Sequence, residues 1–347
     1  MSLFAEGDTE GGLQTLERGL EANPEDADCL LVLARVHLLI DAFDEAERFL
    51  ARLVRLQPLH AEAGSHLLFL RYRSGDKAAL EQIRAAAAAP TATAFELLNL
   101  ARALDLTGQG AAAGDAFTRA ALLEPSNSLL RMEAGEAALG RGDAPSAVAH
   151  YQAAVDAAPK RYLLRAYLAK ALVMEDELPR ALEQLSNAIA LSPEELALHE
   201  EMFLLRERMG DFTETSQEAE WLTSRFPENL RYQYWRGVAM LRLGKLDEAR
   251  SVLEEVVLLS SRSAEARQAL ADVYFLLQDL SRAQSLLEEA QHMDPSSSAV
   301  AVGLGKVYLA LGRHAEAGGM LTRAARSPDE RIRAEAQRLI EQFQPKP

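Results

Sequence analysis

The feature that most constrains the fold is a 34-residue unit that occurs twice, back to back, between Ser128 and Pro193. The two copies carry matching residues, most of them small or aliphatic, at the same offsets. Both close on a proline, which lacks a backbone donor and ends a helix. The first copy has Ala134, Gly135, Ala138, Gly142, Ala147, Tyr151, Ala154 and Pro159, and the second has Leu168, Ala169, Leu172, Asp176, Ala181, Leu185, Ala188 and Pro193. Such a period is typical of proteins in which each unit packs only on its neighbours.

The unit resembles the tetratricopeptide repeat, a pair of antiparallel helices, A and B, that cross at small residues. The resemblance implies that Ala147 and Ala181 let helix B approach Gly135 and Ala169 of helix A, with Tyr151 filling the space beside the first crossing. We therefore expect an all-α fold, a right-handed superhelical α-solenoid of antiparallel helix pairs with a C-terminal capping helix. A composition of 48% hydrophobic but only 6% aromatic residues favours helices rich in Ala and Leu.

The resemblance covers essentially the whole chain and predicts about nine and a half repeats. A truncated N-terminal repeat spans 1–24, nine tandem repeats lie within 25–328, and a capping helix and tail span 329–347. The nine repeats are predicted at 27–60, 61–93, 94–127, 128–161, 162–195, 196–229, 230–263, 264–297 and 298–328.

The first repeat is predicted to be incomplete, because its helix A would begin before residue 1. Only the last turn of that helix, Leu3 to Glu6, is present. We expect from this a fragment of a longer protein. Self-association through the open N-terminal repeat is a further expectation, with Leu3, Phe4 and Leu13 as the exposed apolar contacts.

Two repeats depart from the pattern. In the repeat that begins at Ala61, Leu68 replaces the small crossing residue, and the repeat is one residue short. We place the deletion in the turn at 74–76 and expect Leu68 to splay the helix pair. In the repeat that begins at Leu196, Phe203 and Thr215 replace both small residues, while Ala219 stands where a large residue is expected. This exchange preserves volume and favours a changed helix angle.

Charge excludes several classes of partner. The formal net charge of -15 argues against nucleic acid and against anionic membrane surfaces, since both need a basic stripe. A neutral to basic protein or peptide is the favoured partner. The predominance of arginine over lysine and the abundant alanine suggest a bacterial source.

The sequence leaves the compartment undecided. Cys29 is the single cysteine, so an intramolecular disulfide is impossible and redox context is uninformative. The N-terminus lacks a basic and an apolar region of the kind found in signal peptides, and no apolar run approaches transmembrane length. We expect a soluble protein of the cytoplasm or the periplasm, with any targeting segment upstream of residue 1.

No pattern indicates catalysis, a cofactor or a metal. The glycines at 108, 110 and 114 are not preceded by the strand that a dinucleotide loop requires, and they fall at an A–B turn. The seven histidines show no spacing typical of zinc ligands, and no nucleophile motif is present. We predict a protein that is not an enzyme.

The resemblance assigns partner binding to the concave groove lined by helix A, at the second, fifth, sixth, ninth, twelfth and thirteenth positions of each repeat. The candidate groove residues are Arg35, His66, Phe69, Tyr72, Asn99, Arg102, Glu133, Glu136, Tyr167, Lys170, Glu200, Glu201, Tyr234, Trp235 and Asp272. Only Asn99 and Arg102 partly match the family members that grip a C-terminal carboxylate, which argues against that mode.

The groove residues also suggest a gradient of charge. Arg35, Arg73 and Arg102 come early in the chain, and Glu133, Glu136, Glu200, Glu201 and Glu207 follow in the middle. Acidic walls favour a basic or mixed-charge segment. The alternative is that these are ordinary solvated positions. Exposed aromatic residues carry interface energy disproportionately, so the predicted anchors are Phe69, Tyr72, Tyr167, Tyr234 and Trp235.

The function predicted from the sequence is a non-catalytic scaffold that binds a partner peptide or helix in this groove. One alternative is the repeat arm of a larger bacterial transferase whose catalytic domain lies outside this chain. Another is a component of an assembly for envelope, secretion or polysaccharide export.

Overall fold

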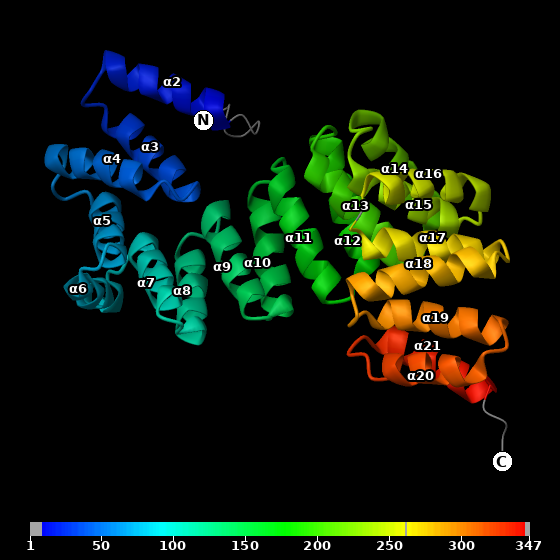
Figure 1. The fold of residues 1–347 in the computed structure, drawn as a ribbon. Helices are drawn as coiled ribbons and strands as arrows, with labels where there is room; N and C mark the ends of the chain where they lie inside the picture. The colour runs from blue at the N-terminus through cyan, green and yellow to red at the C-terminus, as the bar shows by residue number, and fades with distance from the viewer. Residues whose placement is uncertain (1–8, 261, 344–347) are drawn as a thin grey trace. The chain divides into compact units, whose positions relative to one another are not determined.

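A computed structural model describes residues 9–260 and 262–343, and these residues form α-helices and no strand (Figure 1). The expected all-α solenoid is confirmed. The helices are α2 (Thr9–Ala22), α3 (Ala27–Leu39), α4 (Phe43–Leu56), α5 (Ala61–Arg73), α6 (Lys77–Ala88), α7 (Ala94–Leu106), α8 (Gly110–Leu123), α9 (Ser128–Gly140), α10 (Ala144–Ala157), α11 (Tyr162–Met174), α12 (Leu178–Leu191), α13 (Leu196–Met209), α14 (Phe212–Arg225), α15 (Leu230–Arg242), α16 (Leu246–Leu259), α17 (Ala264–Leu276), α18 (Leu280–Met293), α19 (Ser298–Ala310), α20 (His314–Ala324) and α21 (Glu330–Phe343).

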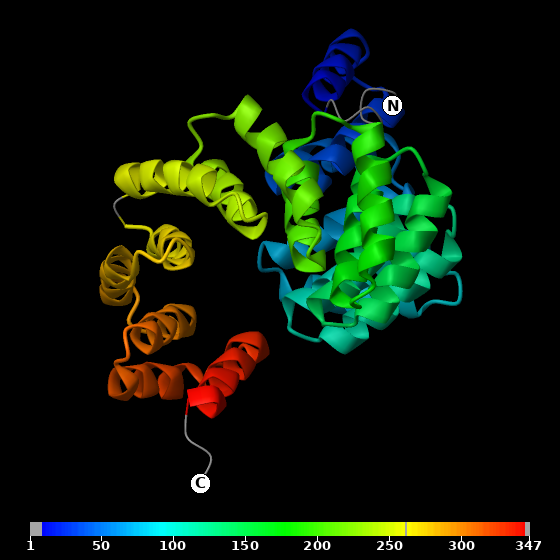
Figure 2. The ribbon, with the colours of Figure 1, turned by 90° about the vertical axis from the view of Figure 1, so that its right-hand side faces the viewer.

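The chain divides into two compact units, one up to Glu194 and one from Glu195 onward. Within each unit consecutive helices lie side by side and pack in A–B pairs, α3 with α4 through α19 with α20 (Figure 1 and Figure 2). We refer to them as the first and the second unit. The division falls at the start of α13, the helix that carries Phe203.

One backbone feature recurs at every A–B turn that the structure describes. The fifteenth residue of each repeat has a left-handed conformation, with φ between 57° and 108°. Glycine supplies it at six turns, because it has no Cβ to clash. Asp41, Asp176 and Gln278 adopt it at the other three. This turn reverses the chain within three residues and fixes the antiparallel pairing of A and B.

Small residues allow the A–B crossings, as the sequence predicts. Ala147, Ala169 and Ala181 are at most 2% exposed. At Gly135 an added Cβ would lie 2.9 Å from the ring of Tyr151, so the tyrosine occupies the space that a side chain would need. The Tyr151 ring therefore packs directly into the crossing at Gly135.

The repeat that begins at Ala61 differs from its neighbours, and the predicted place of its deletion is wrong. The turn between α5 and α6 keeps three residues, as in the repeats on either side, whereas α6 has 12 residues and α4 and α8 have 14. Ala79 and Ile83 are buried as expected, but Ala87 rather than Ala86 completes the buried face. Consistent with the splaying expected from Leu68, α5 packs on α6 less extensively than A and B pack in the other repeats.

The exchange at the start of the second unit is accommodated in the core. Phe203 is 3% exposed, and Thr215 and Ala219 are fully buried. The Thr215 hydroxyl donates a hydrogen bond to the Asp211 carbonyl at 2.8 Å, which satisfies a polar group that would otherwise be buried unpaired. The Phe203 ring stacks on Trp235 at 4.4 Å between centroids.

The two ends of the chain are described in part. Leu3 and Phe4 lie outside the described residues. Leu13 is half-buried rather than fully exposed, and it packs against a cluster of buried residues that includes Leu30, Leu33 and Leu50, which we call the first core cluster. At the other end α21 packs Ala336, Ile332, Leu339 and Ile340 against the last repeat. In the part of the chain that the structure describes, no helix is long and apolar enough to cross a membrane.

Candidate functional site

The first unit contains a hollow of about 620 Å³ on the face formed by its A helices. Side chains of α3, α5, α7, α9 and α11 line it, together with residues of the first A–B turn, α4 and α8. We call it the unit 1 pocket. Its lining residues are Leu38, Asp41, Phe43, Phe69, Arg73, Arg102, Asp105, Leu106, Phe117, Met132, Glu133, Glu136 and Tyr167. Five candidate residues meet here: Phe69, Arg102, Glu133, Glu136 and Tyr167.

Aromatic side chains form much of the pocket wall. Phe69 is buried, and Tyr167 is half-buried and stacks on Tyr151 with 5.5 Å between ring centroids. Burial is the larger cause of a raised pKa at the Tyr167 hydroxyl, and the nearby Glu136 carboxylate raises it further. The guanidinium of Arg73 lies 3.3 Å from the centroid of the Phe43 ring, a cation–π contact. The wall is therefore held by packing beneath it and suits apolar groups.

The charges of the pocket are not arranged as the sequence suggested. Arg102 forms a bidentate ion pair with Glu133, with Nε–Oε2 at 2.9 Å and Nη2–Oε1 at 2.6 Å, so these two charges cancel. Asp41, Asp105 and Glu136 are exposed, and the structure gives their side chains no ion pair among the described residues. With Arg73 as the remaining cation of the lining, the pocket has an excess of negative charge.

The predicted gradient of charge is wrong in part, because two of the three early arginines, Arg35 and Arg102, are paired with neighbouring carboxylates. Arg35 binds Glu62 through Nε and Nη2, at 2.6 and 2.7 Å, in the same geometry as Arg102 with Glu133. Further along the chain, Glu207 lies 3.8 Å from Arg242. In these pairs the arginine of one A helix meets a carboxylate of a neighbouring A helix, on the next repeat for Arg35 and Arg102 and on the preceding repeat for Arg242.

Two candidate residues are enclosed and unable to contact a partner. His66 is 3% exposed and Asn99 is fully buried. The Nδ1 atom of His66 lies 3.1 Å from Oδ1 of Asn99, and the Asn99 amide donates to the Ser65 hydroxyl at 2.7 Å. Together with Glu62 they form a polar network between α3, α5 and α7. The network positions the helices that carry the pocket, which corrects the prediction that His66 and Asn99 line the groove.

Glu62 anchors this network. Its carboxylate accepts both bonds from Arg35 and lies 3.8 Å from Nε2 of His66. Burial alone would raise the pKa of the Glu62 carboxyl, but the contacts with His66 and Arg35 outweigh burial and hold that pKa below its ordinary value. Glu62 therefore contributes stability above the ordinary glutamate pKa, and that contribution is lost as pH falls through the lower pKa of the folded state.

Replacing the carboxylate tests this account. Glu62→Gln is expected to lower the free energy of opening of α3, α5 and α7 by about 2 kcal/mol at pH 7, because a buried charge-assisted contact is lost. The difference from the parent should shrink as pH falls below the ordinary pKa, where Glu62 of the unfolded chain becomes protonated, and should be lost below the lower pKa of the folded state. Hydrogen exchange of 27–106, followed by mass spectrometry, measures it. Glu81→Gln, at a side chain 74% exposed, is the control and should change opening little. An equal effect of both variants would refute the role of Glu62.

The other candidates of the first unit lie outside the unit 1 pocket lining. Tyr72 is half-buried and packs against the first core cluster. Lys170 is exposed on α11. The pocket therefore does not draw on every predicted groove position.

The candidates of the second unit form separate groups. Trp235 is half-buried, with Phe203 on its face and the Arg231 guanidinium 4.5 Å from its ring centroid. Glu200 accepts a hydrogen bond from the Tyr232 hydroxyl at 2.6 Å. Glu201 is exposed.

Asp272 is the unusual carboxylate of the second unit. It is partly buried on α17, and burial raises the pKa of its carboxyl to about 6 against the opposing charges of Lys306 and Arg242. Lys306 pairs instead with Glu335 at 2.7 Å. Burial likewise raises the pKa of Tyr234, which is half-buried and packs on the core of this unit.

Some pocket residues were missed by the sequence reasoning. Asp105 stands at the twelfth position of its repeat, one of the positions that the resemblance assigns to the groove, so the pattern could have identified it. Asp41 and Phe43 belong to an A–B turn and to a B helix, and no groove position points to them. Among the described residues no cluster of His, Cys, Asp or Glu could hold a metal ion.

Comparison with known proteins agrees with this architecture. A tetratricopeptide repeat protein from Parabacteroides merdae ATCC 43184 is 18% identical, with a TM-score of 0.61, and the match covers 71% of this chain and 98% of that one. The type IV pilus biogenesis factor PilW is 16% identical, with a TM-score of 0.51, and the match covers 61% and 98%. At these identities the likeness shows the fold alone. No curated protein matches this chain.

Models of the sequence family are more specific. Models described as Tetratricopeptide repeat match residues 3–67, 98–162, 132–196, 240–290 and 274–342. These matches span both compact units and include the two 34-residue copies between Ser128 and Pro193. The chain belongs to the tetratricopeptide repeat family.

Proposed function

We propose that this protein is a non-catalytic scaffold that binds a basic, partly apolar segment of a partner protein in the unit 1 pocket. Tetratricopeptide repeats indicate a scaffold for protein–protein interaction, and stacked repeats present extended concave surfaces for binding. The proposal adds a place and a chemistry to that general role. The observation that carries it is the combination of an aromatic wall with three exposed carboxylates in one hollow.

The pocket favours lysine or arginine for electrostatic reasons. The Arg102–Glu133 pair cancels itself, which leaves Asp41, Asp105 and Glu136 to set the sign of the local potential. Carboxylates that line a concave wall focus their field and attract cations. The aromatic faces of Phe69 and Tyr167 beside them suit the aliphatic stem of such a side chain, or an apolar neighbour in the same peptide.

Charge reversal tests the proposal with defined peptides. Two fluorescent dodecapeptides share their apolar residues and differ in carrying lysine or glutamate at every third position. Only the lysine peptide is expected to bind, and its affinity should fall as salt is added. Asp105→Lys combined with Glu136→Lys is expected to weaken it at least tenfold, which fluorescence anisotropy measures.

The control matches the change in net charge. Asp115→Lys combined with Glu183→Lys reverses two exposed carboxylates on the B helices α8 and α12 of the same unit, away from the pocket. This variant should bind within about twofold of the parent, since distant exposed charges are largely screened. Equal weakening by both variants, or equal binding of the two peptides by the parent, would show that the pocket does not select the partner.

A further inference from the structure

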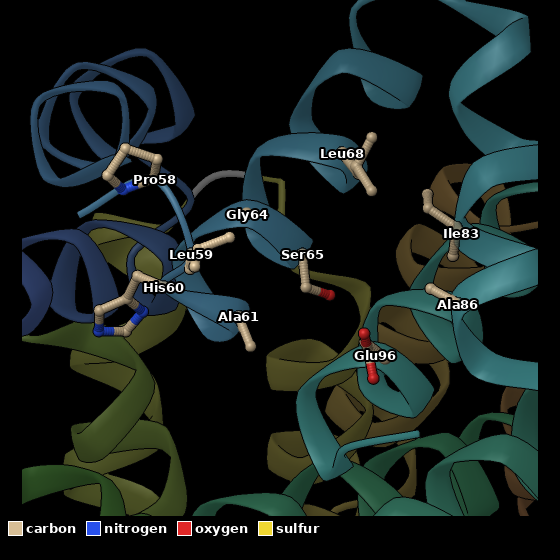
Figure 3. Close-up of a pocket in the computed structure, with 10 residues that line it drawn as sticks. All are labelled: Pro58, Leu59, His60, Ala61, Gly64, Ser65, Leu68, Ile83, Ala86 and Glu96. Carbon is tan, nitrogen blue, oxygen red and sulfur yellow. The ribbon is translucent and has the colours of Figure 1, made fainter. Parts of the chain in front are cut away.

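A second hollow, of about 280 Å³, opens between α5 and α6 in the first unit. It shares no lining residue with the unit 1 pocket. Figure 3 shows its lining: α5 contributes Ala61, Gly64, Ser65 and Leu68, Ile83 and Ala86 of α6 face them, and Glu96 of α7 lies at one end. Pro58, Leu59 and His60 of the preceding turn complete it. We call it the α5–α6 cleft.

The cleft lies in the repeat that has a large residue where its neighbours in the first unit have small ones. The eighth position of helix A is Ala34, Ala101, Gly135 and Ala169 in the other repeats of the first unit, and Leu68 here. Consistent with this large residue, α5 and α6 pack less extensively than the A and B helices of the other repeats. Gly64, one turn earlier, has no atom within 4 Å of the position that a Cβ would take, so the space beside it stays open.

The wall of the cleft is apolar and one end is anionic. Leu68 is half-buried and Ile83 is 2% exposed. The Oε2 atom of Glu96 accepts hydrogen bonds from the Thr93 amide at 2.7 Å and the Thr93 hydroxyl at 3.0 Å, the capping box of α7. The structure gives Oε1 of Glu96 no hydrogen bond within the described ranges. The cap thus fixes a carboxylate at the cleft and leaves one oxygen available.

We propose that the α5–α6 cleft is a second protein-binding site, which takes an aliphatic side chain of a partner segment together with an adjacent lysine or arginine that pairs with Glu96. The volume is near the lower limit of small-ligand pockets, roughly 300 Å³, and so suits one or two side chains rather than a helix. The aliphatic group meets Leu68, Ile83 and Ala86, and the cation meets the fixed carboxylate. At the mouth Leu59, 97% exposed, offers a further apolar contact.

A peptide selection tests the site, after peptides that bind elsewhere on the chain have been removed. A random dodecapeptide library displayed on phage is first depleted on the full chain carrying Gly64→Leu, whose new side chain fills the cleft, and is then selected on the parent. The surviving peptides are expected to share an aliphatic residue next to lysine or arginine. A synthetic survivor is then titrated into protein with labelled isoleucine methyl groups. It should shift the Ile83 methyl signal, assigned with Ile83→Val, in a saturable manner.

Three variants define the contacts. Gly64→Leu is expected to abolish the Ile83 shift, and Glu96→Gln to weaken binding about tenfold, because glutamine can keep the capping box but not the charge. Gly319→Leu, at an exposed helical glycine of α20 that also has no atom within 4 Å of a Cβ, is the matched control and should bind like the parent.

Several results would overturn the proposal. They are the absence of surviving peptides, survivors without a basic residue, or unchanged affinity in Glu96→Gln. Sedimentation velocity adds one more: a dimer of the parent that Gly64→Leu dissociates would assign the cleft to a second copy of the chain. Because the cleft and the unit 1 pocket share no residue, either site can fail without the other.

Discussion

Tyr151→Ala is expected to lower the free energy of unfolding of the first unit by about 3–5 kcal/mol, the range for removing a large aromatic side chain from a core. Tyr151 is 1% exposed and belongs to the largest fully buried side chains of the described residues. Its ring fills the space over Gly135, which no Cβ can share, so the remaining cavity cannot be closed by a small shift of one helix. Hydrogen exchange of residues 128–174 measures the loss at the affected crossing.

The same substitution should weaken peptide binding in the unit 1 pocket. Tyr167 stacks on Tyr151 and would lose the support that orients it in the pocket wall. Tyr151→Phe keeps the ring and is the control, with an expected change in stability below about 1 kcal/mol. A loss below 1 kcal/mol in Tyr151→Ala would show that the crossing tolerates a cavity and that the ring does not hold the pocket wall.

Asp272→Asn is expected to stabilise the second unit at pH 7 by about 3 kcal/mol. Burial raises the pKa of the Asp272 carboxyl from 3.8 to about 6, and each unit of pKa corresponds to about 1.36 kcal/mol. Because the folded state holds this proton more tightly than the unfolded state, the contribution of Asp272 to stability falls as pH rises from about 4 to 6 and stays constant above. Asparagine has no charge to bury, so the advantage of the variant should appear over that range.

The tryptophans provide the measurement, because Trp221 and Trp235 are the only ones in the chain and both lie in the second unit. Urea unfolding followed by their fluorescence from pH 4 to pH 8 gives the difference between variant and parent. Asp247→Asn, at a side chain 81% exposed, should stay within about 0.5 kcal/mol of the parent. If Asp272→Asn proves less stable than the parent at pH 7, the carboxylate is stabilised by its cationic neighbours, and the account of burial is wrong.

The two residues behind these expectations, Tyr151 and Asp272, differ in how far the sequence alone could predict their surroundings. The crossing of Gly135 with Tyr151 was predictable, because the repeat places a small residue and a filler at set offsets. The raised pKa of Asp272 was not, since it comes from burial in the folded unit, and the opposing charges of Arg242 and Lys306 belong to α15 and α19, roughly one repeat away in the sequence on either side.

The amino-acid sequence alone accounts for the helical architecture and its period, and it predicted several of the residues that line the unit 1 pocket. These are local or nearest-neighbour properties: which residues are small enough for a crossing, where a turn needs a left-handed residue, and which face of helix A is left unpacked. For that reason five predicted groove residues, Phe69, Arg102, Glu133, Glu136 and Tyr167, line one pocket.

Which of the polar groups remain available depends on the packing of neighbouring repeats. Arg35 and Arg102 face carboxylates from the next repeat, and His66 and Asn99 are enclosed between A helices, although all four occupy predicted groove positions. A position in the repeat gives the direction of a side chain, but its partner belongs to the neighbouring repeat and depends on the distance between the two helices. That distance is set by packing, and for the same reason the cleft that Leu68 lines was not apparent from its place in the sequence.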